Sequence, residues 1–286
     1  YGNGQLGSEP DVIAQLNQGV IDMARVAAPS LANDSPAYHT FGLPYVFGSE
    51  EEYYRVMDSP EMAEFFRSSI DDGFVGLTYY TSGARSFYTA ATPVRTPADL
   101  RGLKIRVQDM RSQTQLMETL GAAPVAMGFG EIYTALERGT IDATEWGTLY
   151  ENISPGFYKV AKYLIIPGVH QPTAPFELVI NKDAWAELSE EDQRIVRDAA
   201  FMTTINSWLT IGQEDAKALA FYREQGNEIV ELDPEVQYAG REAGLKWAEG
   251  IAADNAWFKR VLDHQAEFAA LWGDAHRYRT VKVRDE

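Results

Sequence analysis

Residues 96–107 read TPADLRGLKIRV, and this stretch decides the fold class. Its first four letters, TPAD, are the start signal of a short helix: a capping threonine, a proline in the first turn and an aspartate three positions after the cap. The run LKIRV at 103–107 has the apolar alternation of a strand. Ile105 and Val107 share one face of that strand, and Arg106 points to the other.

The alternation of helix and strand continues downstream. Helices are expected at 112–120 and 131–138, each followed by a glycine, and short strands at 124–127 and 141–143. Strands that alternate with helices of about ten residues are typical of parallel βαβ units. The pattern therefore predicts an α/β protein.

The elements expected outside this block complete the α/β pattern. A helix-type pattern from Ser189 to about residue 225 is far longer than an average helix and can tie two lobes together. A helical block at 236–272 follows, and the last residues, 277–286, form a charged tail. The remaining expected elements are a helix after the capping box at 8–11, strands at 21–26, 74–80, 86–90 and 176–180, and helices at 50–57 and 60–70.

Composition excludes several classes of function. The 286 residues are 45% hydrophobic, enough to bury a large core in two lobes. The net charge of −17 opposes binding to nucleic acid or to an anionic membrane surface. The chain has no cysteine, which excludes disulfides, thiolate nucleophiles and cysteine metal sites and suits an oxidising compartment. No apolar run reaches the roughly 20 residues that a membrane span needs.

Two arginines offer positive charge in this acidic chain. Arg85 lies in SGARSFYT (82–89), and Arg106 lies on the strand described above. A guanidinium on a strand is a planar fork whose donors match both oxygens of a carboxylate. No obvious nucleophile accompanies the two arginines. The combination indicates that an anion is bound rather than chemically converted.

Motifs that would indicate an enzyme are weak. GNGQLG at 2–7 matches G-x-G-x-x-G, but the strand that a dinucleotide site requires cannot be seen before it, so a turn and helix cap is the favoured interpretation. The four histidines form no metal-binding spacing, and no serine triad motif is present. His170 lies in a loop between strands, where it is a candidate for the cleft lining, although a surface or capping role is favoured. No metal or cofactor is therefore expected, and an enzyme acting on carboxylates, such as a nucleotide-dependent dehydrogenase, is kept as the alternative.

Trp146 and Glu145 stand at the end of a predicted strand. They follow IDAT (141–144) and precede Gly147, at the strand ends where α/β sheets place their ligand clefts. The tryptophan ring can pack against an apolar part of a ligand. Glu145 has two equally weighted interpretations: it accepts a hydrogen bond from a ligand hydroxyl, or it forms an ion pair that holds an arginine.

Several of these runs resemble one protein family. YTSGARSFYT (80–89), TPADLRGLKIRV (96–107) and LGAAPVAM (120–127) are similar to the solute-binding proteins of TRAP (tripartite ATP-independent periplasmic) transporters. LPYVF (43–47) fits upstream, and LS (188–189) fits downstream. The similarity extends over most of the chain, up to about residue 270.

The resemblance implies a two-lobed periplasmic receptor that closes around a small organic acid and delivers it to a membrane permease. Nucleic acid and direct insertion into a membrane are not expected. No signal peptide is seen in the sequence, and an initial strand and helix of the family pattern are expected to be missing before Tyr1. Lobe I is expected to comprise 1–82 and 173–210, lobe II 83–172 and 211–270, and the C-terminal tail 271–286.

The resemblance also assigns roles in the site. It implies that Arg106 pairs with the ligand carboxylate and that Arg85 supplies a second contact. It implies that Phe129 lines the cleft and that Trp146 faces the ligand, at a position where many relatives have asparagine. The ligand-binding set expected is completed by Glu145, Gln108 and His170.

The ligand class stays open at this stage. Trp146 with GFYKVAKY (156–163) resembles the branch of the family that binds 2-oxo and 2-hydroxy monocarboxylates, some of whose members hold the carboxylate through a cation. The segment around Arg85 instead looks like relatives that bind sugar acids, and its permanent positive charge can occupy the place of such a cation.

Overall fold

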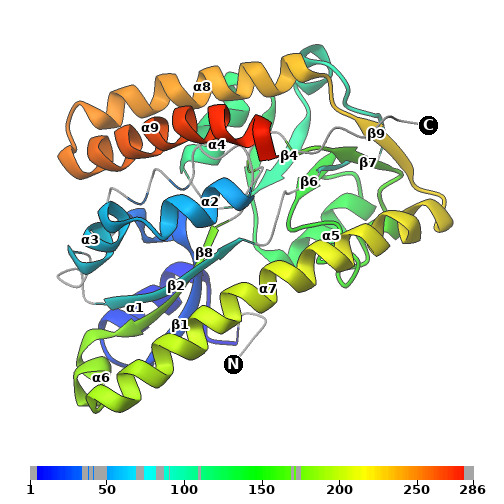
Figure 1. Ribbon diagram of the computed structural model, residues 1–286. Helices are drawn as coiled ribbons and strands as arrows, with labels where there is room; N and C mark the ends of the chain where they lie inside the picture. The colour runs from blue at the N-terminus through cyan, green and yellow to red at the C-terminus, as the bar shows by residue number, and fades with distance from the viewer. Residues whose placement is uncertain are drawn as a thin grey trace.

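The computed structural model describes residues 5–33, 38, 41, 50–68, 74–81, 87–89, 91–108, 111–168, 171 and 175–279. Within these residues the strands form two separate sheets, and helices cover both. Figure 1 shows the smaller sheet at the lower left and the larger one at the right, with a long helix running along both. The architecture is the expected mixed α/β fold with two lobes.

The smaller sheet has three strands in the order β1-β8-β2. Their bounds are Met23–Ala27, Pro175–Asn181 and Phe74–Thr81. Both pairings are antiparallel, so the parallel βαβ pattern expected from the sequence does not extend to this sheet. The helices around it are α1 (Glu9–Asn17), the 3-10 helix η1 (Ala28–Asn33), α2 (Glu50–Met57), α3 (Pro60–Ser68) and α6 (Lys182–Glu187).

Helix α1 begins at the capping box that the sequence predicted. The Asp11 carboxylate accepts hydrogen bonds from the Ser8 backbone N–H, at 2.8 Å, and from the Ser8 hydroxyl, at 2.6 Å. These bonds lower the pKa of Asp11. Ile13 and Leu16 are buried on the inner face of the helix. The first turn is therefore fixed, and with it the position of Glu9.

The larger sheet has six strands in the order β5-β4-β6-β3-β7-β9. Strands β5, β4 and β6 are parallel, as are β7 and β9, whereas β3 runs antiparallel to both of its neighbours. The strands are β3 (Phe87–Thr89), β4 (Lys104–Val107), β5 (Ala123–Ala126), β6 (Ala143–Glu145), β7 (Tyr163–Ile166) and β9 (Glu228–Glu231). The helices that connect them are η4 (Pro97–Leu100), α4 (Arg111–Thr119), α5 (Phe129–Glu137) and η5 (Phe157–Lys159).

The six-stranded sheet is packed on both faces. Leu164 and Ile165 are neighbours on β7 and both are fully buried, but they belong to different apolar clusters. Ile165 lies with residues of β4 and α4, and Leu164 lies with residues of α5 and η5. Because successive strand residues point to opposite faces, a core lies on each side of this sheet. Side chains at the strand ends are consequently held rigidly.

Helix α7 (Glu190–Glu224) joins the two sheets. Near its start Val196 packs against the cluster that contains Val75 of β2, and near its end Tyr222 is buried in a core of the six-stranded sheet. The Ser189 hydroxyl accepts the N–H of Asp192 and caps the helix. The expected long helix across both lobes is thus confirmed.

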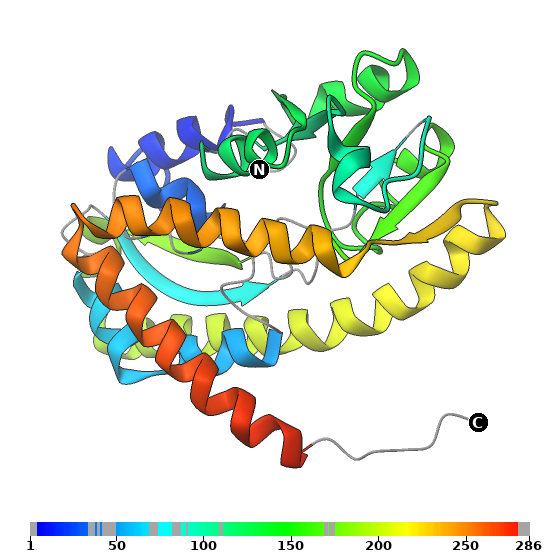
Figure 2. The same ribbon diagram turned by 90° about the horizontal axis from the view of Figure 1, so that it is seen from above.

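The C-terminal part of the chain is a helical hairpin rather than the single helical block expected at 236–272. Helix α8 (Pro234–Ala252) ends, and α9 (Ala256–Arg279) starts after Asn255, whose side-chain oxygen accepts the N–H of Phe258 at 2.7 Å. Figure 2 shows α8 crossing between the two sheets and α9 projecting away from it. Helix α9 packs against α2 and α3 and runs beyond residue 270, where the tail was expected to begin. The assignment of residue ranges to the two lobes stays a prediction.

Of the helices in the described ranges, none combines the length and the apolar character that crossing a membrane requires.

Candidate functional site

Arg106 lies near the end of β4, between β5 and β6, and its side chain is only 3% exposed. Its Nε donates a hydrogen bond to the Met127 carbonyl oxygen at 2.9 Å. Its Nη1 donates to the Glu145 carbonyl oxygen at 3.1 Å and to Glu145 Oε1 at 2.7 Å. The guanidinium is therefore fixed in one plane by its contacts with the ends of the neighbouring strands.

Glu145, the last residue of β6, is fully buried. Besides the ion pair with Arg106, its Oε1 accepts the backbone N–H of Gln108 at 2.9 Å. A carboxylate in this position compensates the buried guanidinium charge, which would otherwise be costly. Of the two interpretations left open from the sequence, this geometry corresponds to the ion pair that holds an arginine.

Two aromatic rings lie beside the ion pair. The ring of Phe129, at the start of α5, is centred 4.4 Å from the ring of Trp146, and the two planes are inclined by 33°. The guanidinium carbon of Arg106 is 5.3 Å from the centre of the Trp146 ring. Trp146 is partly buried and Phe129 is 42% exposed. The pair forms an apolar surface next to the charged groups, with one ring open to solvent.

The turn after Trp146 is closed by a buried asparagine. The Asn152 side chain accepts the N–H of Gly147 at 2.8 Å and donates to its carbonyl oxygen at 3.0 Å. A Cβ at Gly147 would lie 2.6 Å from the Glu151 carboxylate, so this close approach requires glycine. The backbone that carries Trp146 is thereby held against the strand end.

Gln108 connects this region to the smaller sheet. Its side-chain amide donates to Glu9 Oε2 on α1 at 3.0 Å. Glu9 also accepts the N–H of Ala27 and the hydroxyl of Ser30, each at 2.6 Å. A half-buried carboxylate from the N-terminal helix therefore faces the strand end that carries Arg106.

Sequence reasoning missed Glu9. In the capping box, Asp11 fills the position that caps the helix, and Glu9 looked like an ordinary acidic residue of a first turn. The only sign of it in the sequence is that Glu9, beside Pro10, takes no part in the capping box and so has a carboxylate available for another contact.

The structure brings together five of the seven sequence-predicted site residues. Hydrogen bonds or ring contacts link Arg106 to Glu145 and Trp146, Trp146 to Phe129, and Glu145 to the Gln108 backbone. Arg85 and His170 lie outside the described residues. Among the residues that the structure describes, no three histidine or carboxylate side chains are grouped so that they could hold a metal ion.

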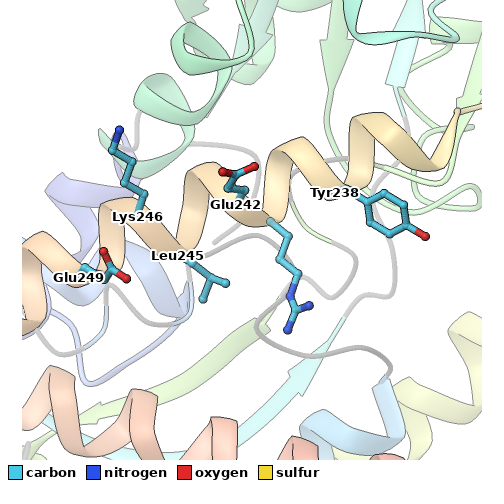
Figure 3. Close-up of a pocket in the computed structure, with 6 residues that line it drawn as sticks. Tyr238, Glu242, Leu245, Lys246 and Glu249 are labelled. Carbon is cyan, nitrogen blue, oxygen red and sulfur yellow. The ribbon is translucent and has the colours of Figure 1, made fainter.

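A hollow of 440 Å³ lies elsewhere, along one side of α8, and Figure 3 shows its lining side chains projecting from that helix. The lining contains both charges, with Arg241 and Lys246 beside Glu242 and Glu249. None of the residues around Arg106 takes part in it. A mixed-charge surface carried by one helix lacks the converging donors that would hold an anion, so we assign the candidate site to the strand ends instead.

Comparison with known proteins gives one family. Residues 1–253 match the model of the bacterial extracellular solute-binding proteins, family 7 (DctP). The protein YiiZ of Salmonella typhimurium is 38% identical over 200 residues, which cover 70% of this chain and 60% of that protein. The 2,3-diketo-L-gulonate-binding periplasmic protein YiaO of Escherichia coli is 29% identical over 79% of this chain and 68% of its own length. The aligned part of the chain thus spans about three fifths of YiiZ.

A solved structure extends the likeness to the three-dimensional fold. A TRAP periplasmic solute-binding protein from Bradyrhizobium, in complex with D-galacturonate, superimposes with a TM-score of 0.81 and 35% sequence identity. The match covers 92% of this chain and 87% of that one. The family description, the name of YiaO and the Bradyrhizobium structure describe binding proteins and give the enzyme alternative no support.

Proposed function

Because the chain belongs to family 7 of the bacterial extracellular solute-binding proteins, the receptors of TRAP transporters, we propose that it captures a small organic acid between its two lobes. The periplasm is the compartment in which we expect this to happen, and a membrane permease is the partner that receives the acid. The observation that carries the proposal is the buried Arg106 guanidinium, which Glu145 and Met127 hold in a fixed plane.

Arg106 is proposed to bind the ligand carboxylate. The net charge of −17 repels anions at long range, so an anion site in this chain depends on a local cation. A guanidinium already held in place by Met127 and Glu145 loses little side-chain entropy when it donates a hydrogen bond to a carboxylate. Arg85 is proposed as a second contact, on the resemblance alone.

We propose a sugar acid as the ligand class. A sugar acid needs one cation for its carboxylate and several acceptors for its hydroxyl groups. Glu9 supplies carboxylate oxygens across from Arg106, and the Gln108 amide between them can donate as well as accept. The Bradyrhizobium relative was solved with galacturonate, and YiaO is named for a sugar acid that also carries keto groups.

A 2-oxo monocarboxylate is the second candidate ligand, and Trp146 is the observation that favours it. The Trp146 and Phe129 rings make an apolar surface of a size that suits a short alkyl chain. A ligand of this kind would offer Glu9 no hydroxyl group. Tighter binding of sugar acids would indicate that Glu9 sets the ligand class. Tighter binding of 2-oxo monocarboxylates would indicate that the aromatic pair does.

Closure follows from the arrangement of the two sheets. Glu9 and Gln108 come from opposite sides of the site, so a ligand that touches both favours the conformation in which they are close. Closure removes water from the pair of Arg106 and carboxylate and strengthens it. The free energy of ligand binding therefore drives closure of the two lobes.

The test is a thermal-shift titration with hexuronates, aldonates, 2-oxo acids, 2-hydroxy acids and dicarboxylates, and with NAD for the enzyme alternative. A ligand bound only to the native state raises the melting temperature in proportion to ln(1 + [L]/Kd). We expect the largest shift with a sugar acid. Recovery of the unchanged ligand by NMR after long incubation separates a receptor from an enzyme.

Arg106→Ala should weaken binding of that ligand by roughly 2–5 kcal/mol, because the carboxylate of the enclosed ligand loses its positively charged partner. Arg106→Lys should also weaken it, since an ammonium group lacks the planar set of donors that bonds Met127 and Glu145 while a ligand is bound. The matched control is Arg138→Ala, which removes an exposed arginine at the end of α5. Unchanged affinity in Arg106→Ala, or a shift with NAD alone, would contradict the proposal.

A further inference from the structure

Helix α7 holds the turn that follows Trp146. The Asp215 carboxylate on this helix accepts the backbone N–H of Tyr150 at 2.8 Å and the hydroxyl group of Thr148. Thr148 is fully buried, so its hydroxyl group depends on a partner within the protein. One side chain of α7 therefore fixes both ends of a three-residue segment of the turn.

A second side chain of α7 bonds the residue in the middle of that segment. Tyr222 lies about two helical turns after Asp215, on the same face of the helix, and is fully buried. Its hydroxyl group donates to the Leu149 carbonyl oxygen at 2.8 Å. Leu149 and Tyr222 also belong to the apolar cluster that contains Trp146. Residues 148–150 are thus bonded to α7 at three successive positions.

The turn carries an aromatic ring that borders the candidate site. Trp146 directly follows β6, and the Asn152 side chain bonds both backbone groups of Gly147, the next residue. The Trp146 ring is centred 5.3 Å from the Arg106 guanidinium carbon and 4.4 Å from the centre of the Phe129 ring. A shift of the turn by about 1 Å would disturb both contacts. The position of the ring therefore depends on what holds the turn.

We infer that Asp215 and Tyr222 are positioning residues for the Trp146 ring, and that the position of this ring sets the affinity for the organic acid. The second part rests on the proposed function, in which the acid binds at Arg106. Asp215 and Tyr222 act through the backbone of residues 148–150 rather than by touching the acid. A side chain that faces a ligand is placed accurately only when the residues behind it are held by hydrogen bonds of their own.

The competing explanation is that these hydrogen bonds only stabilise the fold. Loss of a buried hydrogen bond lowers the melting temperature, whatever the bond does for the site. The two explanations differ in what happens to Trp146, because a purely stabilising contact leaves the ring in place in the molecules that are folded. Spectra and affinities measured well below the melting temperature therefore separate the two explanations.

Fluorine NMR of protein labelled with fluorotryptophan reports the surroundings of the ring without any ligand. Trp146→Phe assigns the signal of this residue among those of the six tryptophans. In Asp215→Ala and in Tyr222→Phe that signal should shift or broaden, because each variant removes a bond to residues 148–150. Asp215→Asn should keep the wild-type signal, because its side-chain oxygen can still accept the Tyr150 N–H.

Two matched variants control for the substitutions themselves. Asp198→Ala removes an exposed carboxylate of the same helix, and Tyr163→Phe removes a hydroxyl group that lies 3.2 Å from Lys162 at the surface. Both should leave the Trp146 signal unchanged. A wild-type Trp146 signal in both Asp215→Ala and Tyr222→Phe would overturn the inference.

A double-variant cycle with Trp146 tests the link to binding. Calorimetric titration with D-galacturonate, or with the acid that gives the largest thermal shift, should show about three- to tenfold weaker binding in Asp215→Ala. In a Trp146→Ala background the same substitution should change the affinity by less than about twofold, because the ring that Asp215 positions is gone. An equal loss in both backgrounds would overturn the link between Asp215 and Trp146. If the wild type bound none of the acids, the proposed function would fail, whereas the fluorine signal would still decide whether α7 positions the ring.

Discussion

The buried Arg106 is the residue on which the proposed site depends, and its charge sets the requirements for its neighbours. A guanidinium that is 3% exposed needs a compensating charge and hydrogen-bond acceptors at fixed positions. Glu145 supplies the charge and two oxygens, and Met127 supplies a third oxygen. The same pairing stabilises this part of the fold and orients the guanidinium.

Glu145→Ala should lower the free energy of unfolding by roughly 3–5 kcal/mol, because it leaves the buried Arg106 charge without its partner. Replacing both residues by apolar ones, as in Arg106→Met with Glu145→Leu, should cost less than Glu145→Ala alone. Urea unfolding measures both values, with Glu137→Ala on the surface of α5 as the control. Equal losses in the single and double variants would contradict the ion pair as the source of the effect.

At the residue scale the candidate site residues were selected from the sequence because they stand at the ends of strands. Arg106 was recognisable because its apolar neighbours point the other way, and Trp146 because a glycine follows it directly after a strand. Glu9 could not be found in this way, because its partners Ala27 and Gln108 lie far from it in the sequence. Which carboxylate reaches across a site depends on how two sheets are placed, and local patterns do not contain that information.

At the element scale the helical patterns were right, and so were most of the strands, including the short strands β3, β4 and β5. Helices α2, α4, α5 and α7 lie where the apolar spacing predicted them. Strands β7 and β9 were not predicted; β9 has only two apolar residues, with a glutamate at each end. The antiparallel smaller sheet was not predicted either, since β1 and β8 pair across some 150 residues of intervening chain.

Helix α7 is attached to the larger lobe by Asp215, which accepts the N–H of Tyr150 at 2.8 Å. Burial raises the pKa of Asp215, against the hydrogen bonds from Tyr150 and Thr148, and the charge of Glu151 raises it further. A folded pKa above the unfolded one means that the ionised carboxylate destabilises the folded state. This loss is absent below the ordinary value of 3.8, develops as the pH rises from there through the raised folded pKa, and is complete above it.

Asp215→Asn should therefore melt at a higher temperature than the wild type at pH 7, and the difference should vanish as the pH falls below about 4. The asparagine oxygen can still accept the Tyr150 N–H. Differential scanning calorimetry at several pH values measures the effect, with Asp198→Asn on the exposed part of the same helix as the baseline. A difference that does not depend on pH would show that ionisation of Asp215 is not its cause.

At the scale of the whole molecule, long helices connect the two sheets. Helix α7 packs on β2 and reaches β9, and the chain then returns through α8 to α9, which packs on α2 and α3. A rigid helix that crosses a hinge limits the direction in which the lobes can move. The contacts at the open side, between α1 and the end of β4, are the ones that opening would break.

Gln108→Ala should shift the molecule toward an open form, because it removes the hydrogen bond from Gln108 to Glu9 that joins the two sides of the site. A hydrogen bond to a charged group contributes about 1.5–3 kcal/mol, so ligand affinity should fall by about tenfold or more. Small-angle X-ray scattering should give a larger radius of gyration without ligand, and saturating ligand should restore the wild-type value. Ser30→Ala removes a bond to the same Glu9 carboxylate within one lobe, so it should lower the melting temperature while leaving the scattering curve unchanged. If both variants scattered and bound ligand like the wild type, closure would not depend on the contact between Glu9 and Gln108.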